Sequence, residues 1–178
     1  GADHADLTGE YAAITNELKA VCRHFGKEFL REVPEADFIR ELPALRQEAG
    51  DRAVLRAFHV YAENRRAKAE ADALRGGDFD GFLTLVRESG RSSAMYLQNV
   101  VPTGQTDRQE LVVTIALCES LLGGRGAVRV HGGGFGGTAQ AFVPLDLLDS
   151  FKAGTEAVLG SGSCHVVTIR PVGGVAIK

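Results

Sequence analysis

Five glycines surround one phenylalanine in the stretch His131-Gly132-Gly133-Gly134-Phe135-Gly136-Gly137-Thr138. Glycine lacks a Cβ atom, so it adopts left-handed backbone angles and lets another backbone or a phosphate approach closely. Short runs with period-two alternation flank the stretch, at 127–131 and 138–143. The pattern therefore predicts two paired strands whose connection is either a binding loop or a plain hairpin turn.

Composition predicts one domain over 1–178 with a full core, because the chain has 178 residues, 44% of them hydrophobic. The net charge is −3, with both signs mixed along the sequence and no basic stripe. Nucleic acid and membrane surfaces are therefore disfavoured as partners. The three cysteines, Cys22, Cys118 and Cys164, are far apart and odd in number. This spacing argues against a disulfide framework and favours a cytoplasmic protein.

No metal site is expected in this chain, because its histidines show no paired ligand spacing. They are His4, His24, His59, His131 and His165.

Residues 1–125 read as mainly helical and 126–178 as strand-rich with one helix interposed, which is an α+β pattern. We expect helices at 8–25, after Pro34, after Pro43, from Asp51 to Gly76-Gly77, after an Asp78 cap, at 107–122 and at 145–158. Thr8 is the expected cap of the first helix. Strands are expected at 127–131, 138–143 and 164–170, with a further one at 175–177. This order predicts a small antiparallel split βαβ sheet with several helices packed on one face.

Three motifs carry a resemblance to a known family. Residues 129–137, Arg-Val-His-Gly-Gly-Gly-Phe-Gly-Gly, are similar to the third motif of the GHMP kinases, written R-M-T-G-G-G-F-G-G in the galactokinases among them. Residues 59–64 resemble the galactokinase H-V-x-x-E-N helix, and 164–173 resemble its closing strand. Near the start, Glu10-Tyr11 resembles the beginning of the family's E-Y-N-x-R-R segment, although the asparagine and arginines are replaced.

The resemblance covers nearly the whole chain and implies the C-terminal lobe of a larger two-lobed kinase. The family's N-terminal lobe, phosphate-cradling loop and catalytic aspartate have no counterpart here, so no catalytic residue is expected in this chain. The full-length protein is expected to phosphorylate galactose to galactose 1-phosphate. ATP and Mg²⁺ would be bound mainly by the N-terminal lobe. The isolated chain is expected to be inactive.

The resemblance also assigns roles to residues. Tyr11 is implied to contact the sugar, although its ring equally suits a staple between helix and sheet. The glycine loop, Gly132, Gly133, Gly134, Phe135, Gly136 and Gly137, is implied to line the nucleotide cleft. Arg129 is a possible support for it, although an alternating strand arginine more often faces solvent. Phe135 either wedges the loop or joins the core.

Two alternatives stay open. One is a non-catalytic sensor of sugar and ATP with the same fold, since a fold does not fix a function. The other is a GHMP kinase for a related substrate such as N-acetylgalactosamine. The residues that separate the first alternative from a kinase belong to the N-terminal lobe.

Overall fold

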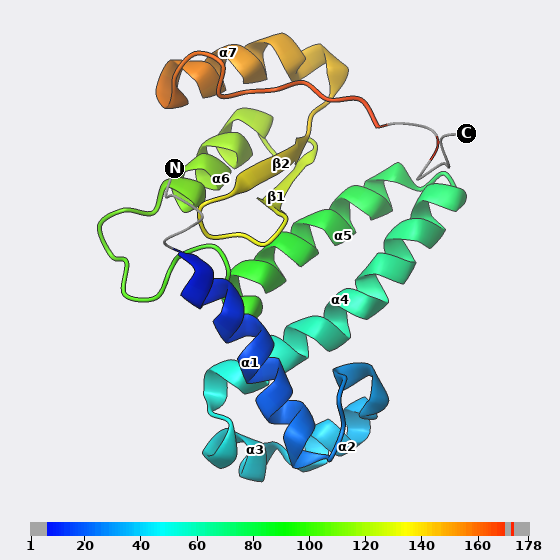
Figure 1. Cartoon of the computed structure of the whole chain (residues 1–178). Helices are drawn as coiled ribbons and strands as arrows, with labels where there is room; N and C mark the ends of the chain where they lie inside the picture. The colour runs from blue at the N-terminus through cyan, green and yellow to red at the C-terminus, as the bar shows by residue number, and fades with distance from the viewer. Residues whose placement is uncertain (1–6, 170–171, 173–178) are drawn as a thin grey trace, which may run out of the picture.

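The computed structural model describes residues 7–169 and 172. Helices dominate, and one β-hairpin lies in the upper half of the molecule between α5 on one side and α6 and α7 on the other (Figure 1). The helices are α1 Thr8–His24, α2 Glu35–Arg40, α3 Leu42–Glu48, α4 Asp51–Arg75, α5 Phe79–Ser92, α6 Glu110–Leu122 and α7 Leu148–Leu159. Short turns of helix are η2 Leu30–Glu32, η3 Ser93–Leu97 and η4 Leu145–Leu147. The strands are β1 Ala127–His131 and β2 Thr138–Phe142.

The helices of the first half form their own core. Val21 of α1, Phe38 of α2 and Leu45 of α3 are fully buried against α4. Phe38 meets Phe58 edge to face, with ring centroids 4.9 Å apart. Pro34 and Pro43 stand at the starts of α2 and α3, where proline costs no helical hydrogen bond. This core fixes the positions of α1 and α4, which carry residues of the candidate site.

The start and end signals of the long helices are mostly confirmed. Helix α4 begins at Asp51 and ends before Gly76-Gly77. Asp78 caps α5, because its Oδ1 accepts a hydrogen bond of 2.9 Å from the backbone N–H of Gly81. The cap predicted for α1 is wrong, since Thr8 is already the first helical residue and Leu7 occupies the cap position.

The β-hairpin is confirmed, and its register pairs Ala127 with Phe142 at one end and His131 with Thr138 at the other. The expectation that helices cover one face is wrong. Val128 packs in a cluster with α6 and α7, whereas Ala127 and Phe142 pack against α5. The Phe142 ring lies edge to face with Phe82 at 5.2 Å, so the hairpin buries apolar side chains on both faces.

The third strand, predicted at 164–170, is not formed over 164–169, which have no regular structure. In the described part of the chain, the sheet contains only β1 and β2. Val167 and Ile169 are 81% and 78% exposed, so this segment gains neither ladder hydrogen bonds nor burial of its alternating apolar residues. Arg170 and the strand predicted at 175–177 lie outside the described residues.

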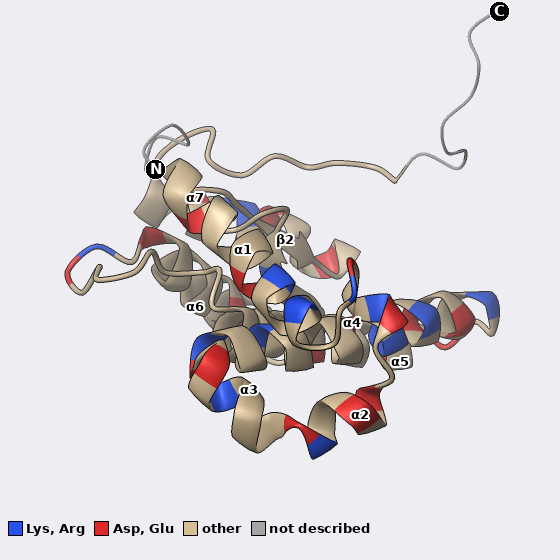
Figure 2. Ribbon diagram, turned by 60° about the horizontal axis from the view of Figure 1, so that its bottom comes forward, with Lys and Arg blue, Asp and Glu red and all other residues tan. Residues whose placement is uncertain are grey.

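Lys and Arg side chains lie among Asp and Glu side chains along α4 and α5 (Figure 2). Among the described residues, no helix has the length and apolar character needed to cross a bilayer.

Candidate functional site

The glycine loop connects β1 to β2 and adopts backbone angles that side chains disfavour. Gly132 and Gly134 have φ angles of +66° and +87°, and Phe135 is itself left-handed at +56°. Gly132 and Gly133 are exposed, whereas Gly134 and Phe135 are buried. The loop therefore presents an edge without side chains to solvent and anchors its centre in the protein.

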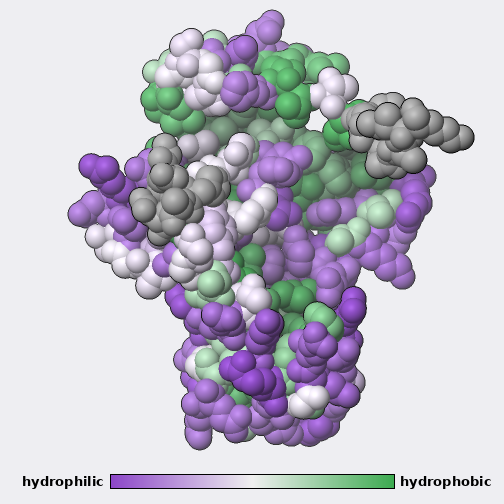
Figure 3. Space-filling model, viewed as in Figure 1, coloured by the Kyte–Doolittle hydropathy of each residue, from purple (hydrophilic) through white to green (hydrophobic). Residues whose placement is uncertain are grey.

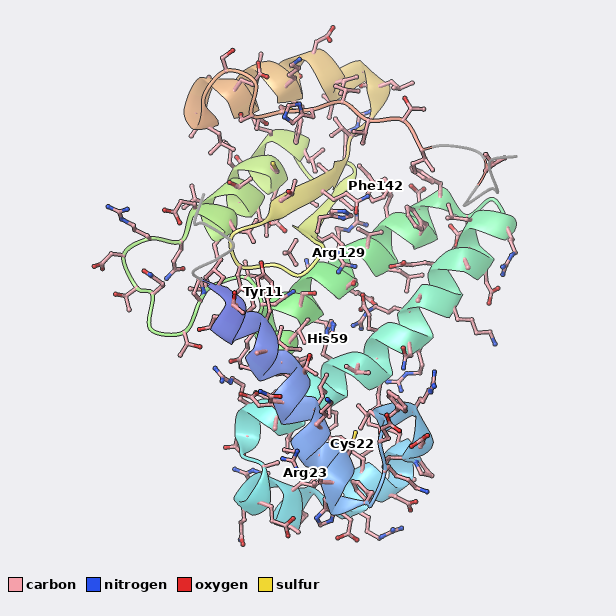
Figure 4. The ribbon with its side chains drawn as sticks, in the orientation of Figure 1. Tyr11, Cys22, Arg23, His59, Arg129 and Phe142 are labelled. Carbon is pink, nitrogen blue, oxygen red and sulfur yellow. The ribbon has the colours of Figure 1, made fainter. Side chains whose placement is uncertain are left out.

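Tyr11 is one of the two anchors of this loop. Its hydroxyl donates a hydrogen bond of 3.0 Å to the carbonyl oxygen of Gly134. Its ring meets Phe135 edge to face at 5.3 Å, and a Cβ on Gly133 would lie 2.8 Å from Tyr11 Cε1. Figure 4 shows Tyr11 near the N-terminal end of α1, beside the loop. The structure thus brings together Tyr11 and the glycine loop, which the sequence had singled out separately.

Asn99 is the second anchor, and no sequence motif pointed to it. Its backbone oxygen accepts a hydrogen bond of 2.6 Å from the N–H of Phe135. Its side-chain Nδ2 donates to the carbonyl oxygen of Gly133 at 3.3 Å. A Cβ on Gly134 would lie 2.0 Å from the Asn99 backbone oxygen, so only glycine fits there.

A buried ion pair supports the segment that carries Asn99. The Arg56 side chain is fully buried, and its Nε donates to the carbonyl oxygen of Leu97 at 3.0 Å. Its Nη1 lies 2.8 Å from Glu17 Oε2, which joins α4 to α1. Burial lowers the pKa of Arg56 below that of free arginine, against the opposing effect of Glu17. The pair fixes Leu97 two residues before Asn99.

Glu10 holds the following loop to α1. Its carboxylate accepts hydrogen bonds from Thr103, from the backbone N–H at 2.9 Å and from the hydroxyl at 3.1 Å. Arg52 donates to the same Thr103 hydroxyl at 2.9 Å and pairs with Glu17. Glu10, the residue before Tyr11, therefore joins α1 to Thr103, in the loop that follows Asn99.

Arg129, the possible support, lies in a polar network on the α5 side of the hairpin (Figure 4). Its Nη1 donates to Ser89 Oγ and to Glu63 Oε1, the latter at 3.2 Å. Glu63 also pairs with Arg66 at 2.8 Å. Burial by itself raises the pKa of Glu63, but the hydrogen bonds from Ser89 and Arg66 and the two arginine charges outweigh it, so the pKa is lowered.

His59 belongs to the same region and is buried. Its Nδ1 lies 2.9 Å from Ser92 Oγ, and burial lowers its pKa. The H-V-x-x-E-N pattern of 59–64 thus holds α4 to α5 in this structure, by polar contacts between the two helices.

A groove of about 560 Å³ lies at the other end of the hairpin from the glycine loop. Figure 3 shows apolar side chains gathered there, below α7. Its lining includes Phe79, Leu83, Arg87, Phe142 and Pro144. None of the residues assigned by the sequence resemblance lines this groove.

Two galactokinases, one matched by sequence and one by structure, are similar to this chain. No protein-family profile matches the chain. A galactokinase from Glaesserella parasuis is 30% identical over 149 residues, which is 84% of this chain and 37% of that protein. The crystal structure of Lactococcus lactis galactokinase complexed with galactose superposes with a TM-score of 0.63 at 26% identity, covering 85% of this chain and 38% of that one.

The chain thus spans less than two fifths of the length of these two relatives. The small antiparallel sheet among helices is the arrangement of a galactokinase C-terminal domain. In sequence and in fold, the chain is a relative of the galactokinases.

Proposed function

We propose that this chain is a single domain, the C-terminal lobe of a two-lobed galactokinase that transfers the γ-phosphoryl group of ATP to galactose. The observation that carries the proposal is the hydrogen bond between Tyr11 and Gly134, at 3.0 Å. It joins the helix that resembles the family's sugar-contacting segment to the loop that resembles its third motif. Two motifs distant in sequence therefore share one place in the fold.

In this proposal, the exposed edge of the glycine loop forms one wall of the cleft between the lobes. Gly132 and Gly133 have no side chains, so a phosphate or the other lobe can approach the backbone closely. The Gly133 and Gly134 carbonyl oxygens are both taken by protein donors, Asn99 and Tyr11. These hydrogen bonds hold the loop in place before substrate binds, which is what phosphoryl transfer chiefly requires of a protein.

The proposed cofactors are ATP and Mg²⁺, with the metal held by the phosphates and by the N-terminal lobe. Within the part of the chain that the structure describes, no three His, Cys, Asp or Glu side chains are grouped to hold a metal ion. The chemistry of the metal is charge neutralisation at the phosphates. The lobe's own contribution is to position the loop and Tyr11. We place the protein in the cytoplasm, where three free cysteines stay reduced.

A coupled ADP-release assay on the full-length protein tests the function. The assay supplies Mg-ATP and, in turn, galactose, N-acetylgalactosamine, arabinose and mevalonate. We expect turnover with galactose and none with the isolated chain 1–178. Turnover only with N-acetylgalactosamine would change the substrate but keep the reaction. Binding of ATP without turnover on any alcohol would overturn the kinase in favour of a sensor.

A further inference from the structure

We propose that Asn99 is the positioning residue of the glycine loop, setting where the loop's exposed edge stands in the cleft. The inference rests on the proposed function for its kinetic consequence, but its structural part stands alone. Asn99 lies outside every motif that pointed to the family. It acts through Gly133, Gly134 and Phe135 rather than by touching substrate.

Three contacts join Asn99 to consecutive residues of the loop. The side chain donates to Gly133 O, the backbone oxygen accepts from Phe135 N, and the same oxygen occupies the space of a Cβ on Gly134. Tyr11 adds a hydrogen bond to the same loop, at Gly134. Asn99 therefore constrains the loop at three successive positions, which fixes both its place and its tilt.

The environment of Asn99 argues against a packing role. The residue is 3% exposed, and its Oδ1 has no hydrogen-bond partner among the described residues. A buried amide oxygen without a hydrogen-bond partner is less favourable than a satisfied one. An aliphatic side chain would fill the space without that cost. The amide is explained by the bond that Nδ2 makes to the loop.

The backbone conformation of the residues before Asn99 directs Asn99 toward the glycine loop. Residues Ser93–Leu97 form a turn of π-helix after α5, and Gln98 follows with φ +55° and ψ +50°, in the left-handed region. Such π-helical turns are frequent at functional sites. Arg56 Nε donates a hydrogen bond to the carbonyl oxygen of Leu97. The chain therefore leaves α5 by a strained route whose end places Asn99 against the glycine loop.

The test replaces the amide in the full-length protein. Asn99→Asp keeps the shape but puts a carboxylate against the Gly133 carbonyl, and Asn99→Ala removes the donor without adding charge. Asn16→Asp is the matched control, since Asn16 is exposed on α1. Hydrogen–deuterium exchange of peptides spanning 131–138 reports how firmly the hydrogen-bonded amides of the loop are held, Phe135 N–H among them. We expect exchange there to rise about tenfold in both Asn99 variants and to match the wild type in the control.

The kinetic readout separates positioning from folding. Well below the melting temperature, where all variants are folded, we expect kcat with galactose to fall about tenfold in both Asn99 variants, as for one lost hydrogen bond of about 1.4 kcal/mol. A merely structural residue would leave kcat unchanged there. Unchanged loop exchange in both variants overturns the inference. A wild type without galactose turnover overturns the proposed function instead, and the exchange result still decides the role of Asn99.

Discussion

Tyr11 and Gly134 are 123 positions apart in the chain, and the Tyr11 hydroxyl donates a hydrogen bond of 3.0 Å to the Gly134 carbonyl oxygen. This bond links the first helix to the centre of the glycine loop. The ring of Tyr11 adds an edge-to-face contact with Phe135. The start of α1 and the glycine loop, which both resemble galactokinase segments, therefore hold one another in position.

Removing only the hydroxyl measures that link. We expect Tyr11→Phe to lower the free energy of unfolding by about 1 kcal/mol, because the ring contact stays and a hydrogen bond to a buried carbonyl is lost. Urea denaturation at neutral pH measures the change. Tyr96→Phe, at an exposed tyrosine, is the control and should match the wild type. Equal stabilities of the Tyr11 variant and the wild type would show that the bond contributes nothing.

Substitution of Gly134 tests the close approach of Asn99. In Gly134→Ala, the new Cβ would lie 2.0 Å from a backbone oxygen at a φ of +87°. We expect a loss of about 3 kcal/mol, since neither backbone can yield cheaply. Gly132→Ala meets no atom within 4 Å at a φ of +66° and should cost about 1 kcal/mol, from the left-handed angle alone. Similar melting temperatures for the two variants would contradict the described contact.

The Glu17–Arg56 pair is expected to matter far more than a surface pair. Glu17→Ala leaves the fully buried Arg56 guanidinium without its carboxylate, which costs about 3–5 kcal/mol. Glu35→Ala removes the partner of Arg65, which is 62% exposed, and should cost about 0–1 kcal/mol. Thermal unfolding of the two variants compares them. The expectation fails if the two variants melt within a degree or so of one another.

The polar network at Glu63 predicts a pH dependence. The folded-state pKa of Glu63 is lowered, so its contribution to stability is complete above the ordinary value of 4.5 and disappears as pH falls through the folded value. Glu63→Gln is therefore expected to be less stable than the wild type at pH 7. This difference should shrink on acidification below pH 4.5.

Glu88→Gln, at an exposed glutamate of α5, provides the comparison for that experiment. Its stability should follow the wild type at every pH. A stability difference for Glu63→Gln that stays constant from neutral to acidic pH would contradict the lowered pKa.

Local signals in the sequence predicted much of the fold. The start of α4 at Asp51, the cap of α5 at Asp78 and the β-hairpin all follow from interactions within a few residues. The strand expected at 164–170 depended on a partner elsewhere in the chain, which period-two alternation does not identify. The sequence did not predict that helices cover both faces of the hairpin, because the second face is covered through the contact of Phe142 with Phe82, which is distant in the chain.

The candidate site divides in the same way. The cluster of glycines is visible in the sequence because glycine alone tolerates the left-handed angle and the close approach at Gly134. Asn99 is not visible in this way, because one of its contacts uses a backbone oxygen that every residue type has, and its side chain meets Gly133, which is distant in the sequence. Gln98, which directly precedes Asn99, has a left-handed φ angle although it is not a glycine. The sequence therefore does not mark the turn that places the Asn99 oxygen.

We propose that the exposed edge of the glycine loop lines the cleft of a galactokinase, and a pair of glycine variants tests this role. Gly132 and Gly162 both have left-handed φ angles, +66° and +78°, and both are exposed. A Cβ added at either glycine would meet no atom within 4 Å. Alanine therefore imposes similar strain at both sites, and only Gly132 lies in the loop.

The measurement is kcat/KM for galactose in the full-length protein carrying Gly132→Ala or Gly162→Ala. We predict a loss of at least about tenfold for Gly132→Ala, as for a misplaced wall of the cleft, and wild-type turnover for Gly162→Ala. Equal kcat/KM for the two variants, or a wild type that forms no ADP with galactose, would show that the glycine loop does not line a galactokinase cleft.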